Sequence, residues 1–146
     1  MKRKTWLFAT LMALGLLVAA CGAGPSKAGP LGGTVKNLAK NADGYTDISV
    51  RQLADLLKKK DFVLVNVHVP YESELPQTDL FVPYDQIAQN LDKLPAKDAA
   101  IVLYCRSGSM STSAAKELAA LGYTNVLEVD GGFNAWRAAG YELIKK

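Results

Sequence analysis

The segment Tyr104-Cys105-Arg106-Ser107-Gly108-Ser109-Met110-Ser111 is the part of this sequence whose residue types best fit chemistry. Its small residues let a loop curl so that several backbone N–H groups point at one centre. A helix expected from Ser111 adds its unpaired N–H groups and its positive end. Such surroundings stabilise an anion, so we expect a nucleophilic thiolate at Cys105 or an oxyanion bound beside it. The alternative interpretation is a buried structural cysteine at the end of a strand.

The serines of this segment, Ser107, Ser109 and Ser111, lack a base that could make a hydroxyl nucleophilic, because His68 is the only histidine. We therefore expect them to donate hydrogen bonds to the loop or to its ligand. One histidine and one remaining thiol are too few for a tight zinc or copper site. The sequence predicts no metal and no organic cofactor.

Residues 1–20 have the pattern of a cleaved export signal. Lys2, Arg3 and Lys4 precede an uncharged run of about 15 residues, which is shorter than the roughly 20 that a membrane span needs. The run ends in Val18-Ala19-Ala20-Cys21, which resembles the lipobox of bacterial lipoproteins. This resemblance implies a lipid on Cys21 that holds an exported protein on the cell envelope, in the periplasm or on the outer face of the cytoplasmic membrane. The alternative is an ordinary signal with an incidental cysteine.

The charge balance of the chain gives no sign of nucleic-acid binding. The sequence has 17 basic and 14 acidic residues, and three of the basic ones lie in the predicted signal. The remaining chain therefore carries equal numbers of basic and acidic residues. With Cys21 lipidated, Cys105 has no second cysteine with which to form an internal disulfide.

The rest of the chain divides into a linker and one domain. Residues 21–44 are rich in Gly, Ala, Pro and Lys and are expected to be a flexible, lipid-anchored tether, and residues 45–146 suit a single domain. Continuous apolar strands between helices predict a parallel sheet with helices on both faces. Residues 70–83 are expected to be irregular. The expected strands are 45–48, 62–67, 100–104 and 126–129, and the expected helices are 50–59 (with Ser49 as N-cap), 84–91, 111–121 and 132–139.

The segment after the third of these strands resembles the active-site loop of single-domain rhodanese-like sulfurtransferases, and the resemblance covers roughly residues 45–143. It implies a three-layer α/β/α fold with a mostly parallel sheet of about five strands. Further matches to the family are Val67, Pro70 and Glu72 in an earlier signature, and Asp130-Gly131-Gly132, Trp136 and Gly140-Tyr141 in the closing segment.

The resemblance implies a role for each part of the loop. Cys105 would take a sulfane sulfur from a small sulfur-containing anion or a persulfide, hold it as a persulfide and pass it to a thiol acceptor. The backbone N–H groups of Arg106 to Met110 would surround it, and the Arg106 side chain would attract the donor. Related cysteine phosphatases have an arginine six positions after the cysteine, where this chain has Ser111, so phosphoryl transfer is disfavoured.

Three positions depart from the family pattern. Asn66 and His68 stand where the family usually has Asp and Arg, and Met110 stands where many relatives have Arg. Loss of a positive charge predicts weaker activity with thiosulfate. We expect Asn66 and His68 to lie in or near the pocket, with a structural hydrogen-bonding role favoured for His68. The alternative function is a lipid-tethered rhodanese-fold module that binds a partner or senses oxidants without turnover.

Overall fold

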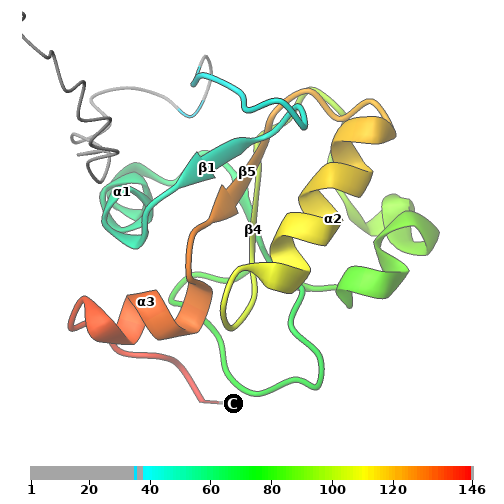
Figure 1. The fold of residues 1–146 in the computed structure, drawn as a ribbon. Coiled ribbons are helices and arrows are strands. Elements are labelled where there is room, and N and C mark those ends of the chain that lie inside the picture. Colours follow the sequence, from blue (N-terminus) through cyan, green and yellow to red (C-terminus); the bar gives the residue numbers. More distant parts are fainter. Residues whose placement is uncertain (1–34, 36–37, 146) are drawn as a thin grey trace, which may run out of the picture.

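The computed structural model describes residue 35 and residues 38–145, and the predicted signal and Cys21 lie outside them. The described residues form an α/β fold around one five-stranded sheet (Figure 1). Every strand pair is parallel, which confirms the predicted mostly parallel sheet. The strands lie in the order β1 (Thr46–Ile48), β5 (Val126–Val129), β4 (Ile101–Tyr104), β2 (Val63–Asn66) and β3 (Leu80–Phe81).

Helices cover both faces of the sheet, and each face has its own apolar core. One core includes Ile48, Leu53 and Phe133, and the other includes Val65, Ile87 and Leu118. The sheet therefore lies between two helical layers, as expected. The helices are α1 (Val50–Leu56) with η1 (Leu57–Lys59) and α3 (Gly132–Ala138) on the first face, and η2 (Tyr84–Lys93) and α2 (Ser109–Ala120) on the second.

Local sequence explains where α1 begins. The Ser49 hydroxyl accepts a hydrogen bond from the Gln52 N–H at 3.3 Å, and the Gln52 side chain accepts one from the Ser49 N–H at 2.8 Å. This reciprocal capping box satisfies two N–H groups at the start of the helix. The prediction of Ser49 as N-cap is confirmed.

Three elements differ from the sequence expectation. A two-residue strand, β3, lies within residues 70–83, which we expected to be irregular, and it is too short for any alternation of side chains to show. The expected helix at 84–91 is a 3₁₀ helix that extends to Lys93. Helix α2 begins at Ser109 rather than Ser111, because Gly108 adopts a left-handed φ of 100° that turns the chain into the helix.

Chain packing also begins before Tyr45, within the segment predicted to be a tether. Val35 is 1% exposed and lies in the core beside α1 and α3, with Leu38 packed against it. Asn41 donates its N–H to the Tyr45 carbonyl at 2.7 Å, and the Thr46 hydroxyl donates to the Ala39 carbonyl at 3.1 Å. Apolar side chains in an otherwise small-residue segment thus attach it to the domain. Among the described residues, no helix is long and apolar enough to span a membrane.

Candidate functional site

Cys105 directly follows β4, at the side of the sheet where the carboxyl ends of the parallel strands lie. In parallel α/β sheets this side is where ligands and reacting groups gather. Its side chain is buried, and its Sγ accepts hydrogen bonds from the Gly108 N–H at 3.1 Å and the Ser111 hydroxyl at 3.4 Å. Hydrogen-bond donors directed at sulfur stabilise negative charge that develops there.

The structure separates the predicted loop residues into two groups. Gly108 and Ser111 contact the Cys105 sulfur, whereas Arg106, Ser107 and Ser109 are exposed. Ser109 and Met110 form the first turn of α2, and the half-buried Met110 packs against the core on that face of the sheet.

The first turn of α3 holds the Cys105 loop in place. The Phe133 N–H donates to the Cys105 carbonyl at 3.0 Å, and the Asn134 N–H donates to the Arg106 carbonyl at 3.1 Å. Gly132 makes this approach possible, because a Cβ at that position would lie 2.0 Å from the Cys105 carbonyl oxygen. The first turn of α3 therefore fixes the backbone on which the thiol is mounted.

Glu72 connects the end of β2 to the Cys105 loop. Its Oε2 lies 3.3 Å from His68 Nε2 and 3.6 Å from Arg106 Nη1. In the sequence, Glu72 stands out only as part of the family's earlier signature, and its sequence neighbours give no sign of these contacts. Glu72 thus forms an ion pair with Arg106, the one arginine of the loop, and partly neutralises its charge.

His68 and Asn66 occupy the buried end of β2. The Asn66 amide donates to the Ser73 carbonyl at 3.0 Å and accepts from the His68 N–H at 3.0 Å. The His68 ring lies edge-on to Phe133, 5.6 Å between centroids, and its Nδ1 has no hydrogen-bond partner among the described residues. Both side chains therefore shape the segment that carries Glu72.

The buried Glu128 is the site residue that sequence reasoning missed. It lies in the middle of β5, and its Oε1 accepts a hydrogen bond of 2.5 Å from the Ser111 hydroxyl. Burial raises the pKa of Glu128 to about 7; the Ser111 hydrogen bond opposes this rise, while the Asp130 and Asp47 carboxylates add to it. The available signal was one acidic residue inside the otherwise apolar Val-Leu-Glu-Val strand.

The carboxylates of Asp47, Glu128 and Asp130 offer oxygens that lie within 4.8 Å of one another. Three negative charges at this spacing repel, so the cluster favours a proton on its most buried member. Of the groups in the described residues, this trio has the donor set nearest to a cation site, and its buried member is already hydrogen-bonded to Ser111.

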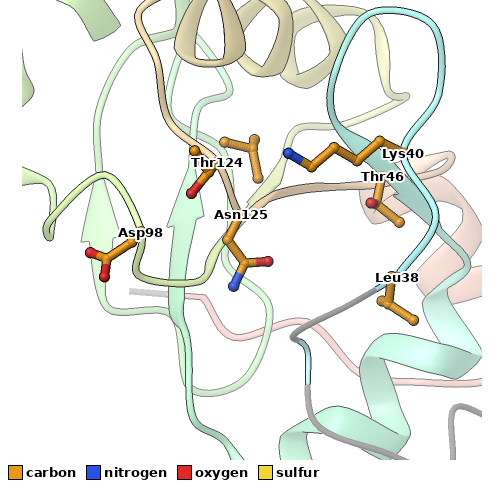
Figure 2. A pocket seen from close by; sticks show the side chains of 7 residues that line it. Leu38, Lys40, Thr46, Asp98, Thr124 and Asn125 are labelled. Carbon is orange, nitrogen blue, oxygen red and sulfur yellow. The ribbon is translucent and has the colours of Figure 1, made fainter.

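A surface cavity of about 430 Å³ lies at the opposite edge of the sheet (Figure 2). Thr46 and Val126, which line it, are the first residues of β1 and β5. The cavity is therefore at the amino ends of the strands, away from Cys105. Its other lining residues are Leu38, Lys40, Asp98, Thr124 and Asn125.

Proteins similar in sequence to this chain include two that are named sulfurtransferases. A thiosulfate sulfurtransferase, GlpE, of Pseudoalteromonas translucida is 30% identical over 105 residues, which is 70% of this chain and 98% of that protein. A sulfurtransferase of Allochromatium vinosum is 34% identical over 97 residues, which is 64% of this chain and 86% of that protein.

The fold is also shared with solved structures. A rhodanese-related protein of Thermoplasma volcanium matches with a TM-score of 0.61 at 23% identity, over 70% of this chain and all of that one. Residues 49–139, which include the Cys105 loop and its supports, match the model of the rhodanese-like domain. The chain therefore belongs to the rhodanese-like domain family.

Proposed function

We propose that this chain transfers sulfane sulfur to a thiol acceptor through a persulfide on Cys105. The observation that carries the proposal is the pair of hydrogen bonds that Gly108 and Ser111 direct at the Cys105 sulfur. The names of the relatives, thiosulfate sulfurtransferase and sulfurtransferase, support the same reaction class.

The reaction has two displacements at sulfur. The Cys105 thiolate attacks the outer sulfur of a donor such as thiosulfate; a new S–S bond forms, the donor's own S–S bond breaks, and sulfite leaves with the electron pair. The acceptor thiolate then attacks the outer sulfur of the persulfide and releases Cys105 as a thiolate. The Gly108 N–H and the Ser111 hydroxyl would stabilise the negative charge on the Cys105 sulfur at the start and at the end of the reaction. The two displacements need no metal or cofactor.

The test is intact mass spectrometry of the full chain after incubation with thiosulfate and then with cyanide. We expect the chain to gain one sulfur atom and lose it to cyanide, and the Cys105→Ser chain, which keeps Cys21, to gain none. A Cys105 that gains no sulfur from thiosulfate or from a persulfide donor would contradict the proposal. Capture of a partner that persists in Cys105→Ser would instead favour a module that binds the partner without turnover.

The second part of the proposal is that a lipid on Cys21 holds the domain on the outer side of a bacterial membrane. It rests on the sequence pattern of residues 1–21. Cells that express the chain and are fed labelled palmitate should incorporate label into it, and the Cys21→Ser chain should remain unlabelled. Equal labelling of the two chains, or none in either, would contradict the lipid anchor.

A further inference from the structure

The carboxyl of Glu128 is buried beside the thiol, and the two displacements described above do not use it. Its Oε1 lies 2.5 Å from the Ser111 hydroxyl, and that hydroxyl lies 3.4 Å from the Cys105 sulfur. Glu128 is 1% exposed. A single side chain, Ser111, therefore touches both the reacting sulfur and a buried acid.

Ser111 has one hydroxyl proton to share among three acceptors, because the Gly108 carbonyl also lies 3.0 Å from its oxygen. When Glu128 is ionised, the shortest contact takes that proton, and the Cys105 sulfur keeps only the Gly108 N–H. When Glu128 is protonated, its own O–H donates to Ser111, which frees the Ser111 proton for the sulfur. The protonation of Glu128 and the stability of the thiolate are thus linked through one hydroxyl.

We propose that Glu128, acting through Ser111, accepts the proton that Cys105 loses when it becomes a thiolate. The inference rests on the proposed function, in which the thiolate is the attacking species. The S–H bond of Cys105 breaks and its proton passes to Ser111 Oγ, while the Ser111 proton passes to Glu128 Oε1. Sulfur keeps the electron pair and the carboxylate becomes a carboxylic acid. Cys105, Ser111 and Glu128 together carry one negative charge before the step and one after it.

The surroundings of Glu128 suit this role. On β4 its register partner is the apolar Leu103, so the carboxylate gains no countercharge there. Burial and the neighbouring carboxylates raise the pKa of Glu128 to about 7, which suits a proton acceptor that works near neutral pH. The charged groups that act on it are the carboxylates of Asp47 from β1 and Asp130 from the segment after β5. The Ser111 hydroxyl from α2 links it to Cys105 at the end of β4.

The test is a pH titration of the Cys105 thiolate by its ultraviolet absorbance in the full chain. The Cys105→Ser chain, titrated in parallel, is the blank that removes the signals of Cys21 and the tyrosines. Two linked groups titrate as a pair. We therefore expect the thiolate to form in two steps. Glu128→Gln keeps the side-chain shape and a donor for Ser111 but cannot accept a proton, so its thiolate should form in one step.

Two further variants separate the proposed route from general electrostatics. Asp130→Asn removes a neighbouring carboxylate, so both steps should remain and move to lower pH. Ser111→Ala removes the bridge and keeps Glu128, so the lower step should disappear. A single step in the unchanged chain, or two steps in Glu128→Gln or Ser111→Ala, would overturn the proposal. Circular dichroism checks that each variant folds; a role for Glu128 in packing alone would alter stability without altering the number of steps.

The titration needs no sulfur donor, so it is independent of whether the chain transfers sulfur. The same preparations are then incubated with thiosulfate, and their masses are measured by intact mass spectrometry. Two titration steps without any gain of sulfur from thiosulfate or a persulfide would contradict the proposed function and support the proton route. Gain of sulfur with a single titration step would overturn the proton route alone.

Discussion

Arg106 is the cation of the Cys105 loop and would attract the anionic donor of the proposed reaction, and Glu72 partly neutralises it. The two groups lie 3.6 Å apart, and both side chains are about half exposed. Ion pairs of this kind contribute about 0–1 kcal/mol. In the proposed reaction a doubly charged donor would therefore displace Glu72 from Arg106, and the competition would weaken its binding.

Glu72→Gln should lower the KM for thiosulfate by about 2–5-fold with little change in kcat, because the arginine charge becomes fully available to the donor. Steady-state kinetics at low salt measure the effect, which should shrink as salt screens the charges. Asp55→Asn is the matched control, since Asp55 near the end of α1 forms an exposed ion pair with Lys58 of η1. An unchanged KM in Glu72→Gln would show that Glu72 does not compete with the donor.

Asn66→Asp restores the residue type usual in the family, yet it should destabilise this protein by about 1–3 kcal/mol. The Asn66 amide donates to the Ser73 carbonyl in a fully buried position, and a carboxylate there would place two acceptors against each other. Urea denaturation measures the loss. Asn90→Asp is the control, because the Asn90 amide also donates to a carbonyl, that of Gln86, but at the surface. Equal losses in the two variants would contradict the argument from burial.

Two segments that follow different strands, the Cys105 loop and the start of α3, pack together at the site. The carbonyl of Cys105, at the end of β4, accepts the N–H of Phe133 at the start of α3. The contact is close enough that Gly132 has no room for a side chain. The position of the thiol therefore depends on an element that follows it by more than twenty residues in the sequence.

Gly132→Ala should destabilise the fold and reduce sulfur loading of Cys105 together. Its Cβ would lie 2.0 Å from the Cys105 carbonyl, and its φ of 47° is left-handed, so the two segments must separate. Gly140→Ala is the matched control, because its φ of 87° is also left-handed but a Cβ there meets nothing within 4 Å. Backbone strain alone costs about 1–3 kcal/mol, so Gly132→Ala should lose clearly more than Gly140→Ala in urea denaturation. Similar losses would refute the steric explanation.

The elements were predictable where sequence pattern determines them. The apolar runs of β2, β4 and β5 predicted buried parallel strands, and the Ser49 capping signal predicted the start of α1. The strand β3 was not predictable, because two residues carry no periodicity and the strand exists only through its pairing with Val65 and Asn66. The start of α2 depends on the left-handed Gly108, which the sequence permits but does not require.

The candidate site was predictable only where it is contiguous in the sequence. The loop from Cys105 to Ser111 carries its own pattern. Glu72 reaches it from the segment after β2 and Glu128 from β5, and their contacts arise from packing between segments that are remote along the chain. One acidic residue in a buried strand was the sole local signal for Glu128.

For the molecule as a whole, the raised pKa of Glu128 makes stability depend on pH. The unfolded chain releases this proton near pH 4.5, whereas the folded chain holds it until about pH 7. The free energy of unfolding should therefore fall as pH rises from 4.5 to 7, by roughly 3 kcal/mol, and then level off. Urea denaturation of the unchanged chain and of Glu128→Gln across this range isolates the contribution, since other groups are common to both. Parallel stability curves would contradict it.

The segment before β1 passes the amino ends of the strands, which lie away from the thiol. Leu38 and Lys40 lie beside the amino ends of β1 and β5, whereas Cys105 follows the carboxyl end of β4 (Figure 1). For a chain anchored at Cys21 as proposed, the 14 residues to Val35 span at most roughly 50 Å. That reach would keep the domain close to the membrane surface. Acceptors would accordingly be those that come near the membrane surface, dissolved thiols and thiols of neighbouring membrane proteins alike.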